Sequence, residues 1–228
     1  MIFVFSAKVN YSVVVLFMSI LRLNDERIEQ ALHHAVAILM SGGIVVYPTE
    51  TFYGIGAKFD SEDSLHKLHK IKQRPDNKPL PLIIGSRNLL AHVASSINNT
   101  ALSLMDRFWP GPLTLILPAK ETLSPYITAD THAVAVRIPG ESFALRLAQY
   151  ARFPITATSA NPAGKPPAQD TETVVDYFGD NVDLIIDGGQ TKGILPSTIV
   201  DVRGENLELV REGAIKSDLL MHAHDHTE

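Results

Sequence analysis

Lys72-Gln73-Arg74-Pro75-Asp76-Asn77-Lys78-Pro79-Leu80 is the stretch around which the chain is organised, because a predicted helix ends at it and a predicted strand begins at its last residue. Its prolines remove backbone donors and disfavour helical geometry in the residues before them. Lys72, Arg74 and Lys78 are therefore expected to project from an irregular loop, where binding residues are common. A solvated basic turn is the alternative, so the case for an anion-binding site depends on what the rest of the chain supplies.

Length and composition indicate a globular protein. The 228 residues, 45% of them hydrophobic, favour one substantial α/β domain over two small ones. The formal net charge of −5 gives no general attraction to nucleic acid, so any anion site must be local. The absence of cysteine excludes disulfides, thiolate catalysis and Cys-ligated zinc, and it is typical of a cytoplasmic protein.

The two ends of the chain differ in character from the part between them. Residues 1–17 are apolar but interrupted by polar side chains, whereas a transmembrane helix needs a run of about 20 apolar residues. They also lack the cleavage site of a signal peptide, so we expect no membrane segment. We interpret them as an additional arm or as a start upstream of a true start at Met18, and favour the second. Residues 18–216 are the expected domain, and residues 217–228 an expected polar, histidine-containing tail.

Hydrophobic periodicity predicts an alternation of helices and strands. A helix that begins after Asn24 is followed by a buried strand at residues 44–47 and by a loop rich in hydroxyls and glycines at residues 48–56. A second helix ends at Ile71. Further strands are expected at residues 80–84, 113–117, 133–138, 155–158, 183–186, 197–202 and 207–210, and further helices at residues 86–94, 100–108, 143–150 and 171–178. The predicted fold is α/β, a single three-layer domain with a twisted mixed β-sheet and a late hairpin.

Two positions outside the basic stretch suggest binding chemistry. Arg137 lies in a predicted strand that is otherwise apolar, so it needs either a buried carboxylate partner or a ligand. Ser159-Ala160-Asn161 follows a strand at its carboxyl end, where open α/β sheets often bind ligands. No complete Rossmann, Walker or G-x-S-x-G pattern is present. His66 and His69 have no third ligand nearby, so no metal site is predicted.

Lys72-x-Arg74-Pro75 together with Ser159-x-Asn161 resembles the lysine–arginine and serine–asparagine signature of the YrdC/TsaC family of L-threonylcarbamoyladenylate synthases. Six further motifs occur in the family's order, namely Pro48-Thr49-Glu50-Thr51, Trp109-Pro110-Gly111-Pro112, Ala135-Val136-Arg137, Asp187-Gly188-Gly189, Pro196-Ser197-Thr198 and Val210-Arg211. Each motif is weak alone, but together they extend the resemblance over residues 28–214.

The resemblance implies a nucleotidyltransferase with a YrdC-like fold that couples L-threonine, bicarbonate and ATP. Its products would be threonylcarbamoyl-AMP and pyrophosphate. Downstream tRNA threonylcarbamoyl-transferase proteins would then use the adenylate to modify the tRNA adenosine beside the anticodon. Because the attacking carbamate and the triphosphate are both anionic, fixed cations and metal must screen their repulsion. Mg²⁺ is expected to arrive with ATP.

The resemblance also assigns residues to the two substrates. Those expected to bind ATP are Lys72, Arg74, Lys78, Ser159, Asn161 and Arg211, of which Lys72, Arg74, Ser159 and Asn161 are also the expected catalytic residues. Those expected to bind threonine are Thr51, Arg137 and Ser197, with Arg137 paired to the threonine carboxylate. No residue is assigned as a metal ligand. Some relatives have asparagine at the position of Lys78, although a cation there suits a phosphate.

Two variants of the family differ from this sequence. The larger members have a second domain after a linker, and the chain is expected to be the single-domain form. YciO-like paralogues lack the Lys-x-Arg and Ser-x-Asn residues, all four of which are present here. The alternative function is a tRNA- or double-stranded-RNA-binding module without adenylate synthesis. The net charge of −5 and the lack of an aromatic and basic stripe favour the enzyme, with at most weak tRNA binding.

Overall fold

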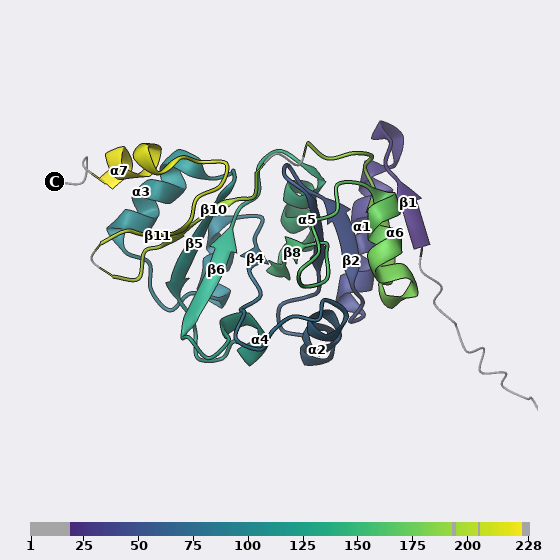
Figure 1. Cartoon of the computed structure of the whole chain (residues 1–228), viewed down its shortest axis with the longest axis horizontal. Coiled ribbons are helices and arrows are strands. Elements are labelled where there is room, and N and C mark those ends of the chain that lie inside the picture. Colours follow the sequence, from purple (N-terminus) through teal and green to yellow (C-terminus); the bar gives the residue numbers. More distant parts are fainter. Residues whose placement is uncertain (1–18, 193–194, 205, 225–228) are drawn as a thin grey trace, which may run out of the picture.

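The computed structural model describes residues 19–192, 195–204 and 206–224, and it contains two mixed β-sheets that lie beside one another (Figure 1). The first sheet has the order β1-β9-β2-β3-β8 and the second has the order β11-β10-β5-β6-β4-β7. The α/β class and the mixed strand directions are confirmed. The expectation of one sheet is corrected, because the strands divide between two. The expected N-terminal arm, residues 1–17, lies outside the described residues.

The elements have the following bounds. The first sheet consists of β1 (Ser19–Arg22), β9 (Leu184–Asp187), β2 (Val45–Pro48), β3 (Tyr53–Gly56) and β8 (Thr158–Ser159). The second consists of β11 (Glu208–Arg211), β10 (Thr198–Asp201), β5 (Leu113–Pro118), β6 (Ala133–Arg137), β4 (Leu82–Ile83) and β7 (Ile155–Thr156). The α-helices are α1 (Ile28–Met40), α2 (Glu62–Ile71), α3 (Asn99–Phe108), α4 (Pro125–Thr128), α5 (Phe143–Ala151), α6 (Thr171–Phe178) and α7 (Ser217–His224). Short 3₁₀ helices are η1 (Asp25–Arg27), η2 (Arg87–His92) and η3 (Gly179–Asn181).

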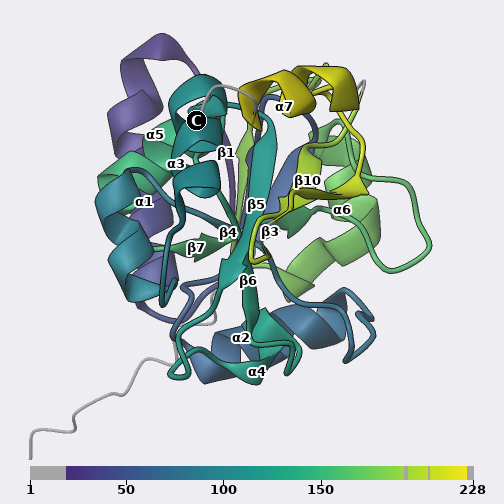
Figure 2. The same ribbon diagram turned by 90° about the vertical axis from the view of Figure 1, so that its left-hand side faces the viewer.

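The apolar run that consists of Ile44 and the first three residues of β2 alternates between two apolar cores. Ile44 and Val46 belong to a core that also includes side chains of the second sheet, whereas Val45 and Tyr47 belong to a core shared with α1 and α5. Successive side chains of a strand point to opposite faces, so this strand is buried on both sides. The continuous apolar run of residues 44–47 therefore has a structural cause. Helices α1 and α5 lie together on one side of the first sheet and α6 lies on the other (Figure 2).

The chain crosses from one sheet to the other within residues 155–159. The strand expected at residues 155–158 is divided, since β7 pairs with β4 in the second sheet and β8 pairs with β3 in the first. Thr156 fixes the crossing: its backbone N–H donates to the Ala57 carbonyl at 2.9 Å, and its hydroxyl accepts the Ala57 N–H at 2.9 Å. The two sheets are thus joined at the point where Ser159-Ala160-Asn161 begins.

Several elements differ from the expectation. Strand β3 lies in the segment expected to be a loop, and it pairs antiparallel with β2, with Val46 opposite Ile55. The segment at residues 86–94 is helical but forms the 3₁₀ helix η2. Residues 217–224, expected as a polar tail, form α7 with Leu220 buried against the core. The late hairpin is confirmed by β10 and β11, and no helix in the described part of the chain has the length and apolar character needed to cross a membrane.

Gly56 shows why a strand can contain two glycines. A Cβ atom added there would lie 2.1 Å from the backbone oxygen of Thr156, so only glycine permits β3 to approach the crossing segment this closely. Gly56→Ala is expected to lower the free energy of unfolding by about 2 kcal/mol or more, because backbone must shift to relieve the contact. Denaturant unfolding measures the loss. Gly204→Ala is the control, since the nearest atom to its added Cβ is at 3.8 Å. Equal unfolding midpoints for both variants would contradict this account of β3.

Candidate active site

Lys72 follows the last residue of α2 and connects this helix to the segment after β8. Its side chain is buried, with 3% of the residue exposed. The ammonium donates to the carbonyl oxygens of Ser159 at 2.5 Å and of Asn161 at 2.6 Å. The Lys72 carbonyl in turn accepts the Ala163 N–H at 2.8 Å. Lys72 therefore fixes the loop after β8 against the end of α2.

The electrostatic state of Lys72 is unusual for a lysine. Burial lowers its pKa to about 7, and the positive charge of Arg74 contributes to the lowering. Within the described residues its ammonium has two neutral carbonyl partners and no carboxylate in an ion pair. A buried cation without an anionic partner is costly. An anion bound next to it would restore the charged form, as expected of a site for a phosphate.

Arg74 stabilises the basic stretch through hydrogen bonds to backbone carbonyls of the same stretch. Its guanidinium donates to the carbonyls of Lys78 at 2.9 Å and Pro79 at 2.7 Å, and to the hydroxyl of Thr158 at 3.3 Å. Burial lowers the pKa of Arg74 as well. The expectation of an irregular loop is confirmed, and Gln73 adopts a left-handed φ of 50° within it. The expectation that all three cations project from this loop is wrong for Lys72, whose side chain is buried. Lys78 is exposed, and its backbone rather than its side chain makes the contact with Arg74.

Ser159, the last residue of β8, and Asn161, in the loop that follows, contact each other. The Ser159 hydroxyl donates to Asn161 Oδ1 at 2.5 Å, and the Asn161 amide nitrogen donates to the carbonyl of Lys165 at 2.6 Å. The structure thus brings together the four residues of the lysine–arginine and serine–asparagine motifs. The side-chain donors that the resemblance assigns to phosphates are engaged within the loop, so their direct contribution to ligand binding requires reorientation.

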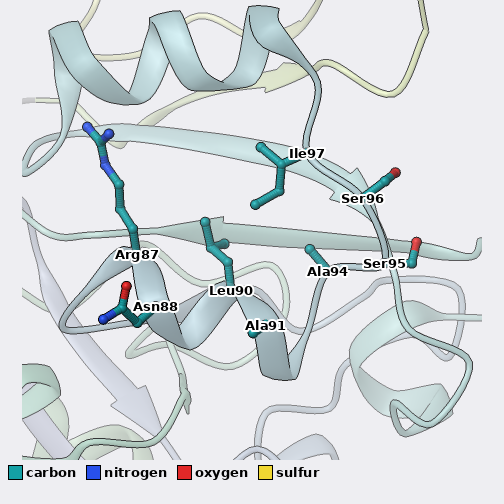
Figure 3. A pocket seen from close by; sticks show the side chains of 8 residues that line it. All are labelled: Arg87, Asn88, Leu90, Ala91, Ala94, Ser95, Ser96 and Ile97. Carbon is teal, nitrogen blue, oxygen red and sulfur yellow. The ribbon is translucent and has the colours of Figure 1, made fainter.

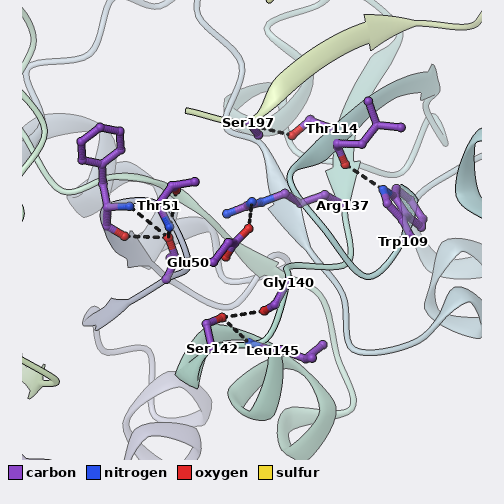
Figure 4. Close-up of polar contacts among 12 residues, drawn as sticks. Glu50, Thr51, Trp109, Thr114, Arg137, Gly140, Ser142, Leu145 and Ser197 are labelled. Atoms are coloured by element: carbon purple, nitrogen blue, oxygen red, sulfur yellow. Dashed lines mark hydrogen bonds and ion pairs between the residues drawn. The ribbon is translucent and has the colours of Figure 1, made fainter. Parts of the chain in front are cut away.

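Arg137, at the end of β6, has the carboxylate partner that its apolar surroundings demanded. It forms an ion pair with Glu50, and the two side chains are 11% and 16% exposed (Figure 4). Because Glu50 follows β2 and Arg137 ends β6, the ion pair joins the first sheet to the second. Sequence reasoning quoted Glu50 within a motif but gave it no role. The available signal was its position two residues after the end of a buried strand.

Ser197 and Arg211 lie beside the Arg137 ion pair. The Ser197 hydroxyl is 3.0 Å from the Thr114 hydroxyl, and the Arg211 guanidinium donates to the Ser197 carbonyl at 2.7 and 3.2 Å. Partial burial lowers the pKa of Arg211, and the charge of Arg137 lowers it further. The guanidinium groups of Arg137 and Arg211 are therefore close enough to repel each other, while Glu50 forms its ion pair with Arg137.

Thr51 belongs to a turn whose shape is set by Thr49. The Thr49 hydroxyl accepts the backbone N–H groups of Thr51 at 3.0 Å and Phe52 at 3.2 Å, and it lies 3.1 Å from the Thr51 hydroxyl. This turn leads directly into β3, where Gly54 pairs with Ser159. The turn that contains Thr51 and the segment that holds Ser159 are therefore connected through the neighbouring strands β3 and β8 of the first sheet.

A separate hollow lies between η2 and the segment leading to α3 (Figure 3). Its charged lining side chain is Arg87, which donates to Asp106 at 2.5 Å. The residues expected to bind substrate do not line it. Elsewhere in the described part of the chain, no group of three or more histidine and carboxylate side chains has the arrangement of a metal site.

Comparisons with known proteins point to one family. The family model Sua5/YciO/YrdC, described as "Telomere recombination", matches residues 37–213. The threonylcarbamoyl-AMP synthase of Pyrococcus abyssi is 40% identical over 174 residues, which are 76% of this chain and 51% of the relative. The enzyme of the same name from Bacillus subtilis is 40% identical over 75% of this chain and 49% of its own length. That of Vibrio campbellii is 34% identical over 68% of this chain and 84% of its own length.

Solved structures agree with these matches. P. abyssi Sua5 complexed with L-threonine superimposes with a TM-score of 0.84 at 35% identity, covering 90% of this chain and 60% of that one. Escherichia coli YciO gives a TM-score of 0.77 at 26% identity, covering 87% of this chain and 96% of that one. The chain spans about half the length of the curated P. abyssi and B. subtilis relatives.

The lowered pKa of Lys72 predicts a pH dependence of stability. Between about pH 7 and 10.5 the unfolded chain retains a proton on Lys72 that the folded chain has lost, so stability rises with pH in this window. Each pH unit contributes up to about 1.4 kcal/mol. From pH 7 to 9, the free energy of unfolding of the native protein should therefore rise by about 2 kcal/mol relative to that of Lys72→Met. Denaturant unfolding at several pH values measures this difference, and a constant difference would contradict the lowered pKa.

Proposed function

The chain belongs to the Sua5/YciO/YrdC family, and we propose that it is a threonylcarbamoyl-AMP synthase that uses L-threonine, bicarbonate and ATP. The single observation that most favours a triphosphate substrate is the buried ammonium of Lys72, which has only carbonyl partners and lies beside Arg74. The similarity to synthases from several organisms supports the same activity.

The proposed reaction has two bond-forming steps. The threonine amine attacks the carbon of bicarbonate and gives a carbamate with loss of water. A carbamate oxygen then attacks the α-phosphorus of ATP, and pyrophosphate leaves. Both reactants of the second step are anionic, so fixed cations that neutralise charge on the phosphates lower the barrier. Mg²⁺ bound to ATP would supply further positive charge.

Lys72 and Arg74 have donors to spare for phosphate oxygens. An ammonium has three N–H donors, and Lys72 uses two of them on Ser159 and Asn161. A guanidinium has five, and Arg74 uses three on the loop and Thr158. The remaining donors are held in place by the bonds already made. We infer that Lys78 and Arg211 add charge at the periphery, and that Ser159 and Asn161 shape the loop over the phosphates.

Threonine is proposed to bind at the Arg137 group. The guanidinium of Arg137 would pair with the substrate carboxylate, and the hydroxyls of Thr51 and Ser197 would contact the rest of the amino acid. The solved structure of P. abyssi Sua5 complexed with L-threonine supports this, because that relative binds the same amino acid. The adenylate would pass to cytoplasmic tRNA threonylcarbamoyl-transferase proteins. The alternative, an RNA-binding module, predicts salt-dependent tRNA affinity without ATP turnover.

The first test of this function is product formation. The native protein should form threonylcarbamoyl-AMP and pyrophosphate only when threonine, bicarbonate and Mg-ATP are all present. Lys72→Ala should lower the rate by about 100- to 1000-fold, the usual loss for a preorganised group that stabilises developing charge. Lys70→Ala is the matched control, since Lys70 is an exposed lysine at the end of the same helix. If the Lys72→Ala protein is as active as the Lys70→Ala protein, the assignment of Lys72 to the active site is wrong.

The second test separates the two substrates. Arg137→Ala should weaken threonine binding by about 1.5–3 kcal/mol, the range for hydrogen bonds to charged groups, and should change ATP binding much less. Isothermal calorimetry measures both affinities. Because this variant leaves Glu50 buried without its partner, Arg137→Lys serves as a second variant that retains a cation. Equal losses for threonine and ATP in both variants would contradict the assignment.

A further inference from the structure

The two carboxylate oxygens of Glu50 have different surroundings. Oε1 accepts a hydrogen bond from the Arg137 guanidinium, whereas Oε2 is buried and has no hydrogen-bond partner in the described part of the chain. Buried polar atoms almost always have a partner, and a charged one left without a donor is costly. Since Glu50 is paired with Arg137 in the proposed threonine site, a donor of the bound ligand would supply the partner that this oxygen lacks.

The structure leaves Glu50 little freedom to satisfy this oxygen by moving. The Thr49 hydroxyl holds the turn through the amides of Thr51 and Phe52, at 3.0 and 3.2 Å. A Cβ atom added at Gly140 would lie 3.3 Å from Glu50 Cγ, so the side chain packs against that glycine. The nearby Tyr47 hydroxyl donates to the Thr156 carbonyl at 3.2 Å instead of to the carboxylate.

We propose that Glu50 receives the amino group of the amino-acid substrate while Arg137 binds its carboxylate. In an α-amino acid the ammonium and the carboxylate are attached to the same carbon. A carboxylate and a guanidinium in direct contact present opposite charges at a matching spacing, so the Glu50–Arg137 pair is complementary to the head of an amino acid (Figure 4). The inference rests on the proposed function and extends it, because it makes Glu50 the residue that selects amino acids over other carboxylates.

A ligand that lacks the amine tests this role directly. L-threonine and the 2,3-dihydroxybutyrate of the same configuration differ only in the replacement of the amine by a hydroxyl. The native protein should bind threonine at least about tenfold more tightly, as expected for a charge-assisted hydrogen bond. Glu50→Gln keeps the shape of the side chain but removes its charge. Calorimetry should show that this variant loses about tenfold in threonine affinity and about twofold or less in affinity for the analogue.

An equal loss for both ligands in Glu50→Gln would overturn the proposal, because it would mean that Glu50 acts only by holding Arg137. Asp201→Asn is the matched control, since Asp201 is a carboxylate paired with Arg203 away from the site. Its threonine preference should equal that of the native protein. If Glu50→Gln does not fold, as thermal unfolding would show, Glu50→Asp decides the question. This variant withdraws the carboxylate by one methylene and should reduce the preference for threonine over the dihydroxybutyrate analogue at least about threefold. An unchanged preference would overturn the proposal.

These outcomes are distinct from failure of the proposed function. A native protein that binds neither threonine nor ATP, and forms no adenylate, would contradict the synthase assignment as a whole. A native protein that forms the adenylate, combined with equal losses for the two ligands in Glu50→Gln, would remove only the role of Glu50.

Discussion

The crossing of the chain between the two sheets at residues 155–159 is the constraint on which the site depends. Thr156 ties this segment to Ala57 from both its backbone and its hydroxyl, and Gly56 permits the close approach. The crossing sets where β8 ends, and hence where the carbonyls of Ser159 and Asn161 meet Lys72. A change that moved the crossing would displace an acceptor pair that is held at 2.5 and 2.6 Å from one ammonium.

The charged residues of the site follow two different electrostatic arrangements. Lys72 and Arg74 are surrounded by neutral carbonyl and hydroxyl oxygens, which orient a cation without neutralising it. Arg137 is paired with Glu50, so its charge is compensated before any ligand arrives. The first arrangement suits a ligand with excess negative charge, such as a triphosphate. The second suits a ligand that is neutral overall but charged at both ends, such as an amino acid.

The sequence predicted the parts of this structure that depend on local pattern. The long apolar stretches, the prolines after α2 and the late hairpin each gave the correct element. Strand β3 was missed because its two glycines disfavour a strand locally, and its formation depends on close packing against residues far along the chain. The division into two sheets was missed for a similar reason, since nothing in the run at residues 155–159 shows that Ala157 separates two pairings.

The site residues divide in the same way between what sequence can and cannot reveal. The apolar strand around Arg137 required a partner, but only the tertiary structure identifies it as Glu50, 87 positions earlier in the chain. The basic stretch indicated an anion site, yet its chemistry depends on burial that the sequence does not show. Lys78 is exposed to solvent and contacts Arg74 only through its backbone carbonyl, whereas the side chain of Lys72 is buried. Lys72, Arg74 and Lys78 are thus close in sequence but differ in solvent exposure in the folded protein. Because burial lowers the pKa of Lys72 to about 7, an anion bound beside it can change the protonation state of this lysine near neutral pH.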